Sequence, residues 1–110
     1  MNTKSCKAKA RALQNETARV LRTHYELADD DVKPAIMGES GVDIKLSPTA
    51  KKVVPFDVEC KNKEALNVWS ALNQAEENST EGRTPMLVFK RNHTKIYVAL
   101  EIRDFMRLLE

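Results

Sequence analysis

The chain has 110 residues, 42% of them hydrophobic, and a formal net charge of +2. This content is typical of a globular protein, and the length predicts one domain spanning residues 1–110. No apolar run approaches the roughly 20 residues that cross a bilayer, and the N-terminal residues lack the apolar core of a signal peptide. We therefore expect an intracellular protein with no membrane partner.

The first predicted element is a helix over residues 9–28. The residues that recur there at three- and four-residue steps are Leu13, Thr17, Val20, Leu21, His24 and Ala28. Residues 1–22 also hold six basic side chains and a single acid, Glu16. The basic arm is either a phosphate contact or a solvated helix face. Glu16 shares the side of Leu13, where an unpartnered acid is costly to bury. That favours a role at a site, the alternative being a salt bridge to a neighbouring arginine.

Two strands are expected next, over residues 42–46 and 53–61, joined by a turn at 47–52. Apolar residues alternate along both strands, so Asp43 in the first and Asp57, Glu59 and Lys61 in the second take the opposite face. A short connection predicts an antiparallel hairpin. Asp57 is expected to have a rim or structural role.

The rest of the chain is predicted as a helix from 63 to about 78 capped by Asn62, strands at 85–90 and 95–100, and a helix at 102–109. The core stripe of the first of these helices is expected to include Trp69. The last helix is expected to bury its apolar residues, Ile102, Phe105, Met106 and Leu109. The predicted fold class is α/β, a mixed four-stranded sheet flanked by helices in the order α-β-β-α-β-β-α.

Asp43 and Glu59 would meet on one face of the hairpin, with Lys61 beside them. Carboxylate oxygens suit Mg²⁺ or Mn²⁺, and a lysine beside such an ion can position water or balance charge on a phosphate. This constellation matches what phosphodiester hydrolysis requires. A solvated face with alternating charges would give the same pattern.

Gly41-Val42-Asp43 followed by Glu59-Cys60-Lys61 resembles the PD-(D/E)XK nuclease superfamily, and most closely the archaeal-type and phage Holliday junction resolvases. Val42 stands where the superfamily name has proline. The resemblance implies a restriction-endonuclease-like core and a homodimeric endonuclease acting on branched DNA in recombination. It would work in a bacterial, archaeal or phage-infected cell.

The resemblance also implies residue roles. The implied catalytic residues are Glu16, Asp43, Glu59 and Lys61. The implied ligands of Mg²⁺ (or Mn²⁺) are Asp43, Glu59, Glu16 and the carbonyl of Cys60. Ser40 in the loop and Gln74 in the crossover helix are the implied supporting residues, and a surface position is the alternative for Gln74.

The expected DNA contacts are basic residues directed at phosphates, because no sequence-reading module is recognisable. They are Lys4, Lys7, Lys9, Arg11, Arg83, Lys90 and Arg91. Two alternatives to a junction resolvase stay open. One is a less selective phage nuclease acting on flaps, nicks or single strands, and the other is a catalytically inactive DNA-binding module.

Overall fold

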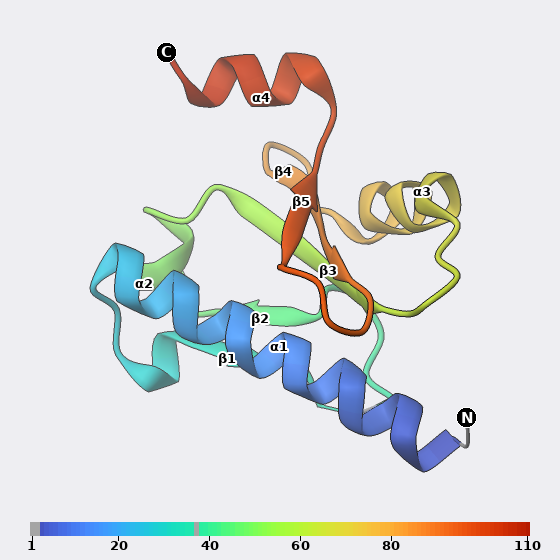
Figure 1. Ribbon diagram of the computed structural model, residues 1–110. Coiled ribbons are helices and arrows are strands. Elements are labelled where there is room, and N and C mark those ends of the chain that lie inside the picture. Colours follow the sequence, from blue (N-terminus) through green and yellow to red (C-terminus); the bar gives the residue numbers. More distant parts are fainter. Residues whose placement is uncertain (1–2, 37) are drawn as a thin grey trace.

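The computed structural model describes residues 3–36 and 38–110 (Figure 1). It is an α/β fold whose elements are α1 (Thr3–Tyr25), a 3₁₀ turn (Asp29–Asp31), β1 (Val32–Pro34), β2 (Ile44–Leu46), α2 (Pro48–Lys51), β3 (Phe56–Asn62), α3 (Val68–Asn78), β4 (Thr84–Lys90), β5 (Tyr97–Ala99) and α4 (Ile102–Leu108). Within the described ranges, no helix combines the length and apolar character needed to cross a membrane.

The strands form two sheets. A mixed sheet has the order β3-β4-β5, with β3 parallel to β4 and β5 antiparallel to β4. Helix α3 is the crossover between the parallel strands, as predicted. A separate antiparallel pair joins β1 to β2. The expected four-stranded sheet is therefore wrong, and a three-stranded sheet with a separate two-stranded one takes its place.

The expected hairpin between the second and third strands is also wrong, because the connecting residues form α2 rather than a turn. Ser47 caps this helix by accepting a hydrogen bond from the Ala50 N–H at 3.1 Å, and Pro48 takes the first helical position. The helix carries the chain away from β2, whose ladder partner is instead β1.

The core lies between α1 and the sheets. Leu13, Ala18 and Leu21 of α1 pack with Val58 and Cys60 of β3, together with residues of β1, β2 and β4. The opposite face of the mixed sheet is covered by α3. The continuously apolar run of β4 is buried from Met86 to Val88, as expected for a strand covered on both faces.

Helix α3 differs from its prediction in start and orientation. Asn67, rather than Asn62, is the N-cap, and its side chain accepts a hydrogen bond from the Ser70 N–H at 3.1 Å. The buried residues of the helix are Ala71 and Ala75. Their small side chains let the helix approach the sheet closely. Trp69, expected in the core, is instead 79% exposed.

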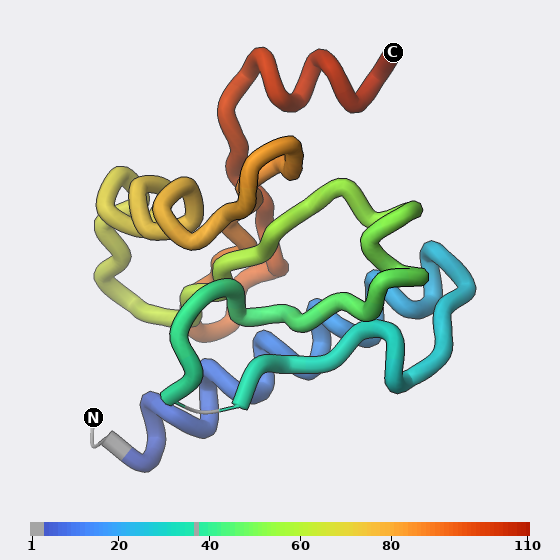
Figure 2. The backbone as a smooth tube through the Cα atoms, turned by 180° about the vertical axis from the view of Figure 1, so that it is seen from behind, coloured from blue at the N-terminus to red at the C-terminus, as the bar shows by residue number. Residues whose placement is uncertain are grey.

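Helix α4 has the expected position but not the expected packing. Its apolar side chains, Ile102, Phe105, Met106 and the adjoining Leu109, are all exposed. Figures 1 and 2 show from opposite sides that the helix projects away from the other elements beyond β5. The expectation that these side chains would be buried within the chain is wrong.

Candidate active site

Asp43 is held beside β3 by two hydrogen bonds. Its backbone N–H donates to the Val58 carbonyl at 2.9 Å, and its Oδ2 accepts the Cys60 N–H at 2.7 Å. Asp43 directly precedes β2, and these bonds bring its carboxylate to the exposed edge of β3 although the two strands share no ladder in the described chain. Asp43 therefore lies next to β3, as predicted, although β2 and β3 do not form the predicted hairpin.

Glu59 lies in the middle of β3, on the face that α3 covers, and is 3% exposed. Asn78 Nδ2 donates to its Oε1 at 3.3 Å, and Lys61 Nζ lies 3.6 Å from its Oε2. Burial raises the pKa of the Glu59 carboxyl, and the adjacent Asp43 carboxylate raises it further. Asn78 and Lys61 lower that pKa only partly, so the two carboxylates still favour a proton or a cation between them.

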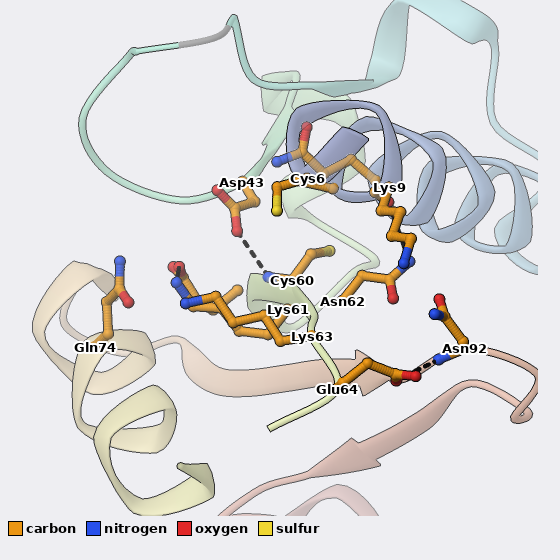
Figure 3. Close-up of a pocket in the computed structure, with 13 residues that line it drawn as sticks. Cys6, Lys9, Asp43, Cys60, Lys61, Asn62, Lys63, Glu64, Gln74 and Asn92 are labelled. Atoms are coloured by element: carbon orange, nitrogen blue, oxygen red, sulfur yellow. Dashed lines mark hydrogen bonds and ion pairs between the residues drawn. The ribbon is translucent and has the colours of Figure 1, made fainter. Parts of the chain in front are cut away.

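These side chains border a cavity of about 560 Å³ (Figure 3). Gln74 from α3 lies on one side, Cys6 and Lys9 from α1 lie on the other, and Lys61 extends between them. The lining residues are Cys6, Lys9, Ala10, Gln14, Asp43, Glu59, Cys60, Lys61, Asn62, Lys63, Glu64, Gln74 and Asn92. Six residues singled out from the sequence are thus brought together, namely Lys9, Asp43, Glu59, Cys60, Lys61 and Gln74.

Cys60 presents two different groups to its surroundings. Its side chain packs in the core, where the thiol donates to the Thr17 hydroxyl at 3.8 Å. Burial raises the pKa of this thiol to about 12, so the sulfur stays protonated at neutral pH. Only its backbone carbonyl is a candidate metal ligand.

Glu16 and Ser40 are not brought to this cavity. Glu16 is half-exposed and paired with Arg19, whose Nε donates to Oε2 at 3.0 Å. This hydrogen bond lowers the pKa of Glu16. The expectation that Glu16 faces the buried side is wrong, because the buried face of α1 runs through Leu13, Thr17 and Leu21. Ser40 is exposed on the loop before β2.

Arg83 is not free to contact DNA. Its Nε donates to Asp57 Oδ1 at 2.7 Å, and its Nη2 donates to the carbonyls of Val54 and Phe56. The expected phosphate contact is therefore corrected to a structural one, in which Arg83 ties the loop before β4 to β3. Arg11 is also engaged, since its Nη1 donates to the Ala35 carbonyl at 2.9 Å.

The other expected DNA contacts divide by location. Lys4 and Lys7 are exposed near the start of α1, and Lys9 lines the cavity. Lys90 and Arg91 line a second cavity close by. The phosphate contacts expected of these five residues stay a prediction.

Sequence reasoning missed several cavity residues. Lys63 continues the alternation of Glu59 and Lys61, so extending that period by one step would have found it. Gln14, two residues before Glu16, lines the cavity, whereas Glu16 does not. Asn78, which does not line the cavity, contacts Glu59 from the last turn of α3, and no local sequence pattern marks it.

The donors present suit a hard cation, although within the described ranges no cluster of three or more His, Cys, Asp or Glu side chains could hold a metal ion. Mg²⁺ commonly takes only one or two carboxylates and completes its shell with water and substrate oxygens. Two carboxylates and a strand carbonyl are therefore sufficient protein ligands.

Comparisons with family models, curated proteins and solved structures found no match. The geometry of the cavity carries the functional argument.

Proposed function

We propose that this chain is a metal-dependent, structure-selective endodeoxyribonuclease with a PD-(D/E)XK type of site, resembling the junction resolvases. The observation that carries the proposal is the meeting of Asp43 and the buried Glu59 beside Lys61 in one open cavity. A buried acid beside another acid is costly unless a cation or a proton is shared. A divalent cation held between the two carboxylates would offset this cost.

The proposed ligands of Mg²⁺ or Mn²⁺ are the carboxylates of Asp43 and Glu59 and the carbonyl of Cys60. The N–H of Cys60 faces Asp43, and the N–H and C=O of one strand residue point to the same side, so this carbonyl faces Asp43 as well. When bound, the ion polarises the phosphodiester and lowers the pKa of the attacking water. Glu16, turned away on α1, is left out of the proposed set.

Lys61 is proposed to position the water that attacks the phosphorus. Its ammonium group is half-buried, 3.6 Å from Glu59, and extends into the cavity where a phosphate would lie. The water oxygen forms a bond to phosphorus as the bond to the 3′-oxygen breaks. The products are a 5′-phosphate and, once the leaving oxygen gains a proton, a 3′-hydroxyl. Lys61 also balances the charge that develops on the phosphate oxygens.

Lys61→Met is expected to lower kcat by roughly 100-fold with little change in KM, because the charge that it removes acts mainly in the transition state. Steady-state cleavage kinetics measure both quantities. Lys63→Met is the matched comparison from the same cavity wall, and we expect it mainly to raise KM by weakening a phosphate contact. Equal effects of the two variants on kcat would contradict the role given to Lys61.

The proposed substrate is branched DNA, with the four-way junction as the first candidate. The basic residues around the cavity, including Lys9 and Lys63, would contact phosphates and so respond to DNA shape rather than sequence. A cleavage assay with Mg²⁺ on junction, flap, duplex and single-stranded DNA tests the proposal. Symmetric paired nicks on the junction would support it. Binding without cutting in any divalent metal would overturn it.

A homodimer is proposed as the active form, since a two-fold assembly would place two sites on symmetric strands. The apolar residues of α4 recur at helical spacing and are exposed, so they suit a contact between copies. We expect light scattering to give twice the chain mass of 12.5 kDa. Phe105→Glu should give the monomer mass, whereas Val20→Glu, at an exposed position on α1, should not. A monomeric wild-type protein would contradict this assembly.

A further inference from the structure

A second cavity adjoins the first. It measures about 360 Å³ and shares Lys63 and Glu64 with the carboxylate-bearing cavity. Its other lining residues come from the loop before α3 and the start of that helix, from the end of β4, from the β4–β5 turn and from the start of β5. They are Leu66, Val68, Phe89, Lys90, Arg91, Thr94 and Tyr97. A ligand crossing the shared wall would reach both cavities.

Two aromatic rings lie in this cavity. Phe89 and Tyr97 are register partners on β4 and β5, and their ring centroids are 6.3 Å apart with a tilt of 39°. Tyr97 is 53% exposed, so part of its ring is open to a ligand. The rings present an apolar surface that side chains in the described chain leave partly uncovered.

The aromatic pair belongs to the same row of side chains as the proposed catalytic lysine. Lys61 is the register partner of Phe89, and Phe89 is the partner of Tyr97, so the three follow one another across the sheet. Adjacent strands are about 4.8 Å apart, which places Tyr97 roughly 10 Å from Lys61 along this row. That separation is on the scale of one or two nucleotides.

Positive charge surrounds the rings. Lys63, Lys90 and Arg91 line the cavity, whereas Glu64 is its acidic lining residue. The Glu64 carboxylate accepts the backbone N–H of Asn92 at 2.8 Å and so holds the β4–β5 turn against the end of β3 (Figure 3). Thr94 Oγ1 accepts the Arg91 N–H at 3.2 Å within that turn. These hydrogen bonds therefore hold the turn that includes Arg91 in place.

We propose that this second cavity binds one unpaired nucleotide next to the cleaved phosphodiester. The base stacks on Tyr97 and Phe89, and its phosphate contacts Lys63, Lys90 and Arg91. Aromatic rings beside cations are the general means of holding single-stranded nucleic acid without reading its sequence. The inference rests on the proposed nuclease function and adds that a branch with an unpaired base is preferred over continuous duplex.

The test measures binding in EDTA, so that cleavage does not interfere. The probes are a continuous duplex and a flapped duplex with 2-aminopurine as the first unpaired base. Wild-type protein should quench the 2-aminopurine and favour the flap. Tyr97→Leu should lose the quenching and bind the flap roughly 10- to 100-fold more weakly, with duplex affinity unchanged. Tyr97→Phe should behave as wild type.

Trp69→Leu is the matched control, since Trp69 is an exposed aromatic residue outside both cavities. Flap binding by Tyr97→Leu equal to that of wild type would overturn the proposal. So would a Tyr97→Leu variant that alters only the mass of the assembly, because the cavity would then hold a second protein copy. Arg91→Gln gives an independent readout and should weaken flap binding more than duplex binding.

The two proposals fail in different ways. If wild-type protein cuts no DNA with Mg²⁺ but Tyr97-dependent quenching persists, the nuclease function fails and the nucleotide site stands. If wild-type protein and Tyr97→Leu cut and bind the flap identically, the nucleotide site fails and the nuclease stands.

Discussion

Glu59→Gln should reduce Mg²⁺-dependent DNA cleavage by about a thousandfold or more, because it removes a charged ligand from the proposed ion site. Asp43→Asn should have a comparable effect. Both substitutions keep the size of the side chain, so the cavity should retain its shape. Single-turnover cleavage of the preferred branched DNA measures the loss without a contribution from product release.

Two controls separate chemistry from folding. Because the pKa of Glu59 is raised in the fold, its ionised form destabilises the metal-free protein at neutral pH. Glu59→Gln should therefore be at least as stable as wild type in thermal unfolding with EDTA. Glu76→Gln, at an exposed position on α3, should cleave normally. Full activity of Glu59→Gln would rule out the assignment of the site.

Glu16→Gln tests the main disagreement between sequence and structure. The resemblance implies a catalytic acid at this position, but the carboxylate pairs with Arg19 away from the cavity. We expect its cleavage rate to stay within a factor of two or three of wild type, and its stability to change little, because the pair with Arg19 is exposed to solvent. A loss of cleavage activity as large as that of Glu59→Gln would show that Glu16 takes part in catalysis.

Asp57→Ala should lower the free energy of unfolding at neutral pH by about 3 kcal/mol. The substitution leaves the Arg83 guanidinium, which is 14% exposed, without its carboxylate partner. It also removes the acceptor of the Thr80 N–H and hydroxyl hydrogen bonds. Urea unfolding gives the change. Asp104→Ala, which breaks the more exposed pair with Arg107 on α4, is the control and should cost under about 1 kcal/mol.

The effect of Asp57 should depend on pH. Burial alone would raise the pKa of this carboxyl, but the hydrogen bonds from Thr80 and Arg83 outweigh burial and hold the pKa below its usual value. The stabilisation is therefore fully present above the unfolded pKa of about 4 and is lost as the pH falls through the lower folded pKa. The gap between wild type and Asp57→Ala should narrow below about pH 4. A gap that stays constant down to pH 2 would contradict the ion pair.

The sequence was sufficient to predict which side chains of β3 share a face, because side chains alternate along a strand with a two-residue period. Asp57, Glu59 and Lys61 do lie on one face, and Val58 and Cys60 lie on the other. The apolar run of β4 likewise indicated a strand covered on both sides. These features depend on local periodicity, which a sequence shows directly.

Features that depend on tertiary packing were not readable. The rotation of α1 about its axis decides whether Gln14 or Glu16 faces the cavity, and that rotation is set by how Leu13 and Leu21 pack. A buried role for Arg83 depends on Asp57, which lies 26 positions earlier in the chain. The four-residue helix α2 begins at one cap, Ser47, and it separates β3 from β2, whose ladder partner is β1.

If Asp43 and Glu59 together hold one divalent cation, calorimetric titration with Mn²⁺ in the absence of DNA should detect the binding of that ion. We predict binding to wild type and to Glu16→Gln, and loss of that binding in both Asp43→Asn and Glu59→Gln. Binding that survives both substitutions, or wild-type protein that takes up no Mn²⁺, would contradict the account.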